Sequence, residues 1–138
     1  MSSPVFVSEE DILWSYISAQ SEISNAVCSM SDEEVSDRFI FNRLYSALCG
    51  LTEMILLVNG KSVPPKLADR VHMVDAIAGY KYVPMECRLL LSGSDCVDRD
   101  RLAGIAQVID CWACMLGNKF SNYLRSIDSR SSVRALVG

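Results

Sequence analysis

The sequence predicts an all-α protein, a single-domain bundle of four to five helices around one long central hydrophobic helix. Apolar residues recur at helical spacing in several segments, and Gly, Pro and Asn residues separate these segments. The strand-like run at residues 80–83 is too short and isolated to count as a strand. At 138 residues the chain has the length of one domain, so residues 1–138 are expected to fold together, with a flexible serine-containing tail at 128–138.

The central helix is expected over residues 31–60. Ser31 followed three residues later by Glu34 matches a capping box, and Asn59 followed by Gly60 supplies a stop signal. Between these signals the apolar residues fall on nearly every side of the helix rather than along one stripe. A helix of this kind is buried by several neighbours, so the remaining helices should pack around it.

The remaining helices follow from the same periodicity. A short turn after the first helix predicts that it packs antiparallel to the central helix. Gly50 interrupts the central helix, and close approach of another helix backbone is the expected reason, because glycine there costs about 1 kcal/mol relative to alanine. Trp14 lies off the main apolar stripe of the first helix and is expected at its edge or on a contact surface. The other expected helices span residues 8–28, 65–79, 84–91 and about 98–127.

The composition favours a protein that binds other proteins. Half of the residues are hydrophobic and only 22% are charged. This hydrophobic content exceeds what a small core needs, which favours a homo-oligomer, most simply a dimer, or a bound partner. The formal net charge of −4 argues against binding of nucleic acid or of an anionic membrane through the whole surface. An acidic surface instead suits a basic partner protein.

The cellular compartment is expected to be the cytoplasm. The first residues lack the basic and apolar regions of a signal peptide. The most apolar run, residues 44–58, is shorter than the ~20 residues of a membrane-spanning helix and contains Glu53. The six cysteines are then expected to be reduced.

Cys111 and Cys114 have the CxxC spacing of redox and metal sites, but they fall in the middle of a long predicted helix. No helix end is available there to lower the pKa of a thiol, so packing in the core is the expected role. Two alternatives stay open. They are a redox-sensing pair, and a metal site completed by Cys87 or Cys96; either one requires Cys111 and Cys114 to be exposed.

Motifs for catalysis are not found, and the chain is expected not to be an enzyme and to hold no cofactor or metal. His72 is the single histidine, and it is expected on or near the surface of the third helix. Glu53 is the only acid deep inside the central helix, and burying it unpaired would be costly. It is therefore expected to meet Arg43, Arg88 or a hydroxyl group, or to face a partner.

The run Asn42-Arg43-Leu44-Tyr45-Ser46-Ala47, followed by Leu56-Leu57-Val58-Asn59-Gly60, resembles the HEPN family. Members of this family are helical bundles, and many act as RNases or as partners of nucleotidyltransferases. Catalytic members carry an arginine and a histidine with four to six residues between them, whereas Pro65, Lys66 and Leu67 occupy the corresponding positions before His72. The resemblance therefore implies a non-catalytic binding role, with a basic cleft that contains Arg43, Arg70 and Arg88.

The interpretation that these observations favour is a non-enzymatic interaction protein, such as an adaptor, inhibitor or immunity-type factor, acting through apolar and acidic helix surfaces. Two alternatives are kept, a HEPN-like module associated with nucleic acid and a cysteine-based redox or metal protein. The residues with a candidate interaction role are Trp14, Arg43, Glu53, Arg70 and Arg88.

Overall fold

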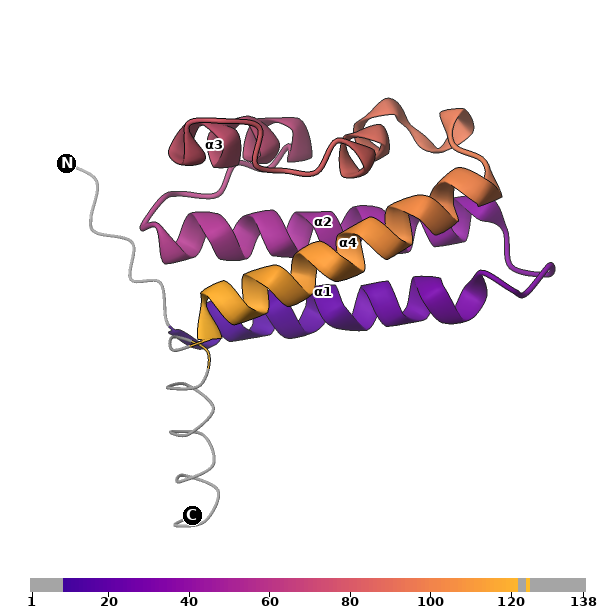
Figure 1. Cartoon of the computed structure of the whole chain (residues 1–138), viewed down its shortest axis with the longest axis horizontal. Coiled ribbons are helices and arrows are strands. Elements are labelled where there is room, and N and C mark those ends of the chain that lie inside the picture. Colours follow the sequence, from indigo (N-terminus) through magenta and orange to yellow (C-terminus); the bar gives the residue numbers. More distant parts are fainter. Residues whose placement is uncertain (1–8, 122–123, 125–138) are drawn as a thin grey trace, which may run out of the picture.

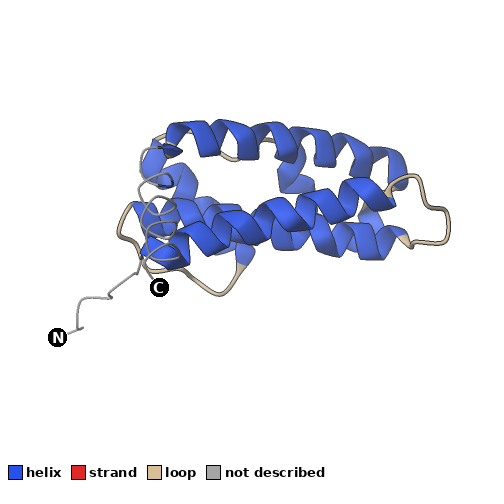
Figure 2. Ribbon diagram, turned by 90° about the horizontal axis from the view of Figure 1, so that it is seen from below, coloured by secondary structure: helices blue, strands red, loops and turns tan. Residues whose placement is uncertain are grey.

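The computed structural model describes residues 9–121 and Leu124, and within this part of the chain it contains helices and no strands (Figure 2). This confirms the predicted all-α bundle. The lead-in 1–8, the tail 128–138 and the last residues of the predicted final helix lie outside the described residues. The elements are the α-helices α1 (Glu9–Ser29), α2 (Asp37–Val58), α3 (Leu67–Ala78) and α4 (Arg99–Lys119), and the 3₁₀ helices η1 (Glu86–Ser92) and η2 (Ser94–Cys96).

The helix α2 is the centre of the bundle. Helix α1 runs antiparallel beside it, α4 crosses both of them, and α3 lies along the other edge of α2 (Figure 1). The two 3₁₀ helices also contact α2, so it has neighbours on most of its sides, as the sequence predicted. Its buried residues are Ile40, Phe41, Leu44, Ala47, Leu48, Leu51, Thr52, Met54, Ile55 and Leu56.

The same helix is the only described one that is long and apolar enough, by length and composition alone, to cross a membrane. In its most apolar window of 18 residues, 56% of the residues are buried within the protein. A core helix of a bundle has this character because it must be covered by protein on several sides.

The start of α2 differs from the prediction, since the helix begins at Asp37 and not near Ser31. Its N-cap is Ser36, whose side chain accepts a hydrogen bond from the backbone N–H of Phe39 at 3.1 Å. In the preceding loop, the side chain of Asp32 accepts a hydrogen bond from the N–H of Glu34 at 3.0 Å. Such a local turn competes with helix formation, so the apparent capping box does not open the helix.

The other helix ends lie close to the expected positions. Asn59 and Gly79 are the C-caps of α2 and α3, and Gly79 has the left-handed conformation (φ 78°) that glycine adopts readily at this place. Helix α3 begins at Leu67 with Lys66 as N-cap, so Pro65 precedes the helix instead of opening it. The short helix predicted after Pro84 is present as η1.

The close contact predicted at Gly50 is confirmed, and α1 is the helix that approaches. A Cβ atom at this position would lie 2.9 Å from the carbonyl oxygen of Ser15 and 3.1 Å from the Cβ of Ala19. Only glycine leaves room for a helix backbone at this separation. Gly50 therefore sets the distance between α1 and α2 at the place where a groove opens on their outer side.

Candidate functional site

A groove with a volume of about 630 Å³ runs between α1 and α2. Its lining includes Gly50, where α1 and α2 approach closely, and serines from both helices. The lining residues are Asp11, Trp14, Ser15 and Ser18 from α1, and Tyr45, Ser46, Cys49, Gly50, Glu53 and Leu57 from α2. We call this set the α1–α2 groove.

Two aromatic residues of the groove are open to solvent. Trp14 is 61% exposed and Tyr45 is 37% exposed. The ring of Tyr45 stacks on the buried ring of Phe41, with 6.2 Å between the ring centroids, and this contact holds it in place. An exposed tryptophan at the edge of a groove is typical of a protein contact surface, because tryptophan is among the residues that contribute most to binding energy when they become buried. Trp14 lies off the core, and its exposure is compatible with both predicted placements, at the edge of the apolar stripe or on a contact surface.

Glu53 is a half-buried carboxylate in this groove, and it has no ion pair or hydrogen bond to the side chains or backbone of the described residues. The predicted pairing with Arg43 or Arg88 is wrong. Arg43 lies 3.2 Å from Glu22 of α1, and Arg88 lies 2.7 Å from Asp75 of α3. The other predicted possibility, that Glu53 faces a partner, stays a prediction.

The three arginines with predicted roles are held in separate places. The Nη1 of Arg43 pairs with Glu22, and its guanidinium lies 5.3 Å from the centre of the Phe39 ring. Arg70 and Arg88 bind other groups. None of the three lines the α1–α2 groove.

Arg70 and Arg88 both fix loops to helices. Arg70 donates hydrogen bonds to the carbonyl oxygens of Pro64 at 2.7 Å and Cys49 at 3.2 Å, which ties the loop before α3 to the middle of α2. Arg88 binds both carboxylate oxygens of Asp75, at 2.8 and 2.7 Å, and the carbonyl oxygen of Val83 at 3.1 Å. Each guanidinium is thus occupied by an internal contact, and the role of either one in a basic cleft stays a prediction.

The cysteine pair of α4 is exposed, so the expected packing of Cys111 and Cys114 in the core is wrong. The core-facing residues are the two between them, Trp112 and Ala113. Cys87 behaves in the opposite way. It is fully buried, and the pKa of its thiol is raised to about 12, mainly by burial and also by the charge of Glu86, against a lowering effect of Arg88.

No group of three or more His, Cys, Asp or Glu side chains in the described part of the chain is placed to hold a metal ion. Cys87 is buried, whereas Cys111 and Cys114 are exposed, and the three form no such group. The side chain of Cys96 lies outside the described side chains. His72 is exposed on α3, as expected.

Cys49 lies in the α1–α2 groove, and burial raises the pKa of its thiol; the charge of Arg70 lowers it and that of Glu53 raises it further. A thiol of this kind stays protonated near neutral pH and is a poor nucleophile. Cys49 is therefore not an activated nucleophile in this groove.

Comparisons with protein-family models, with curated proteins and with solved structures gave no match.

Proposed function

We propose that this protein is a non-enzymatic interaction protein that binds a basic, partly apolar helical segment of another protein in the α1–α2 groove. The observation that carries the proposal is that the exposed Trp14 lines the same groove as Glu53, whose carboxylate has no partner among the described residues. An adaptor, an inhibitor or an immunity-type factor would each use such a surface.

The shape of the groove supports a helix as the ligand. Two antiparallel helices leave a furrow between them, and the side chains of a third helix can pack into it as ridges into grooves. The furrow is open along its length, whereas sites for small molecules enclose most of the ligand surface. A helical segment can place apolar side chains against Trp14, Tyr45 and Leu57 at spacings of three and four residues.

The charges in the groove support a basic ligand. Glu53 and Asp11 both line the groove, and the chain as a whole carries a formal net charge of −4. A lysine or arginine of the ligand placed against Glu53 would supply the counter-ion that the described residues do not provide. Complementary charge of this kind increases the association rate and excludes acidic partners.

Panning the purified full-length protein against a displayed library of helix-forming peptides tests the proposal. Enriched peptides are expected to combine lysine or arginine with apolar residues at helical spacing. Trp14→Ala is expected to weaken their binding by about 30-fold, the effect of losing a binding hot spot of 2 kcal/mol. Glu53→Gln is expected to weaken binding and to reduce its dependence on salt concentration.

Tyr80→Ala is the matched control, because Tyr80 is an aromatic residue of similar exposure (64%) that lies outside the groove. The Tyr80→Ala variant is expected to bind the peptides as tightly as the unchanged protein does. All three variants are expected to have the thermal stability of the unchanged protein. Equal losses for Trp14→Ala and Tyr80→Ala would contradict the proposal, and so would enrichment of acidic peptides. Protection of Trp14 by a second copy of this chain would assign the groove to self-association instead.

A further inference from the structure

The outer face of α4 is an exposed helix surface almost without charge. Its central positions follow one another at spacings of three and four residues, which is the pattern of a seam between two helices. Asp110 is the only charged residue of the helix between positions 102 and 118, and it lies beside this row. The residues of the row, all exposed, are Gly104, Gln107, Cys111, Cys114 and Asn118, and we call them the α4 outer row.

Gly104 has no role within one chain that explains it. A Cβ atom built at this position would meet nothing within 4 Å, so the packing of the described residues does not require a glycine. A glycine in the interior of a helix lowers its stability. On a seam, however, the missing side chain allows a second helix backbone to come close.

Cys111 and Cys114 lie on this same face with both thiols exposed. Residues three apart on a helix have their Cβ atoms roughly 5–6 Å apart. A disulfide needs a Cβ–Cβ distance of about 3.5–4.5 Å, so it would require the helix to distort. A metal ion suits this spacing better, because two thiolates bound to zinc at about 2.3 Å each have their sulfur atoms about 3.8 Å apart.

One chain supplies only half of such a site. Structural zinc sites hold four ligands in tetrahedral geometry, and the described residues contain no third candidate beside the pair. A second copy of the same face, related by a twofold axis that passes near the pair, would supply the other two thiolates.

We propose that two copies of this protein pack their α4 outer rows together and bind one zinc ion through Cys111 and Cys114 of each copy. Four S–H bonds break and four Zn–S bonds form, and the four protons go to solvent. Zinc is preferred over magnesium or calcium because thiolates are soft ligands. The site lies apart from the α1–α2 groove and is independent of the function proposed for it.

The test is the mass and metal content of the reduced full-length protein, measured by gel filtration with light scattering after addition of zinc or of a chelator. The expected result is a dimer with one zinc ion per two chains, and a monomer in chelator. Cobalt(II) in place of zinc is expected to give the intense near-ultraviolet absorption of sulfur-to-cobalt charge transfer and the visible bands of a tetrahedral ion.

Four variants separate the contribution of the metal to the dimer from that of helix packing. Cys111→Ser and Cys114→Ser are each expected to lose the zinc ion and the dimer, whereas Cys28→Ser, at an exposed cysteine of α1, is expected to keep both. Gly104→Arg is expected to abolish the dimer while leaving the monomer folded, because the position has free space around it. Circular dichroism confirms folding of each variant.

Three outcomes would overturn the proposal. The first is one zinc ion bound per chain without a change in mass, and the second is no zinc bound by the reduced protein. The third is a dimer that persists both in chelator and in the Cys111→Ser and Cys114→Ser variants.

Discussion

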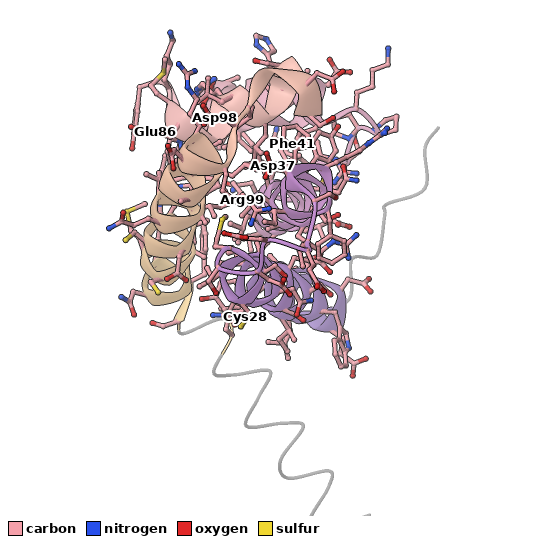
Figure 3. All side chains as sticks on the ribbon, turned by 90° about the vertical axis from the view of Figure 1, so that its right-hand side faces the viewer. Cys28, Asp37, Phe41, Glu86, Asp98 and Arg99 are labelled. Atoms are coloured by element: carbon pink, nitrogen blue, oxygen red, sulfur yellow. The ribbon has the colours of Figure 1, made fainter. Side chains whose placement is uncertain are left out.

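Arg99 donates a hydrogen bond from its Nε to Oδ1 of Asp37 at 2.6 Å, which joins the first residue of α4 to the first residue of α2 (Figure 3). The other two nitrogens of the guanidinium donate to backbone carbonyl groups at the end of α1 and in the loop between α1 and α2. The fixed fork of N–H donors in arginine makes several such bonds at once. The accepting carbonyl groups are those of Ser29, Met30, Asp32 and Val35.

Arg99→Lys is expected to lower the free energy of unfolding by about 2–3 kcal/mol. An ammonium group cannot reach the loop carbonyls and Asp37 together. Each hydrogen bond to a charged group contributes about 1.5–3 kcal/mol. Urea unfolding followed by circular dichroism measures the change. Arg101→Lys is the control, at an exposed arginine of the same helix turn, and it should leave the unfolding midpoint unchanged. Equal midpoints for the two variants would refute this role of Arg99.

Alanine is expected to have opposite effects at two helical glycines. Gly50→Ala should destabilise the protein by about 1–3 kcal/mol, because its Cβ would lie 2.9 Å from the backbone oxygen of Ser15. Gly104→Ala should stabilise the chain by about 0.5–1 kcal/mol, since the position is open and alanine favours the helix. Urea unfolding of both variants in chelator, which removes any zinc-dependent association, gives the comparison. A shift in the same direction for both would refute the packing argument.

Tyr16 and Gly117 are expected to depend on each other. The hydroxyl of Tyr16 donates to the carbonyl oxygen of Ala113 at 3.1 Å, and a Cβ at position 117 would lie 2.2 Å from that hydroxyl oxygen. Tyr16→Phe should cost about 1 kcal/mol for the lost hydrogen bond. Gly117→Ala should cost more, and the two changes together should cost less than their sum, because phenylalanine removes the closest contact. A double-mutant cycle by urea unfolding decides this, and additive effects would contradict it.

Cys87 makes a defined contribution to the dependence of stability on pH. Its folded-state pKa of about 12 lies above the ordinary value of 9.0, so the stability from the buried neutral thiol is complete below pH 9.0 and is lost as the pH rises towards 12. Relative to Cys87→Ala, the unchanged protein should therefore lose stability above pH 9.0 by up to about 1.4 kcal/mol per pH unit. Urea unfolding of both proteins at increasing pH measures the difference. Parallel pH curves would show that the thiol titrates normally.

The sequence was sufficient to predict the helices and the central position of α2, because periodicity and stop signals such as Gly79 are local properties. It was not sufficient to place the start of α2. Ser31 and Ser36 both offer a capping side chain there, and the loop that holds Ser31 outside the helix receives hydrogen bonds from Arg99, 62 residues away from Asp37 along the chain. The pairing of Glu53 also failed for this reason, since the partners of Arg43 and Arg88 come from other helices.

The exposure of Cys111 and Cys114 could have been predicted. The apolar stripe of the last helix includes Ile109, Trp112 and Leu116, and the two cysteines fall on the opposite side of a helix with 3.6 residues per turn. The prediction of core packing relied on the general tendency of free cysteine to be buried, and the helical periodicity outweighs that tendency here. The α1–α2 groove, in contrast, depends on the separation of two helices and has no signature in the sequence beyond Gly50.

The groove residues also have a place in the order of synthesis. Every residue that lines the groove belongs to the part of the chain up to Leu57. The ribosome therefore synthesises both of its walls before it makes α3 or α4. The turn that joins these walls receives the hydrogen bonds of Arg99 only later, so α4 completes the connection between α1 and α2.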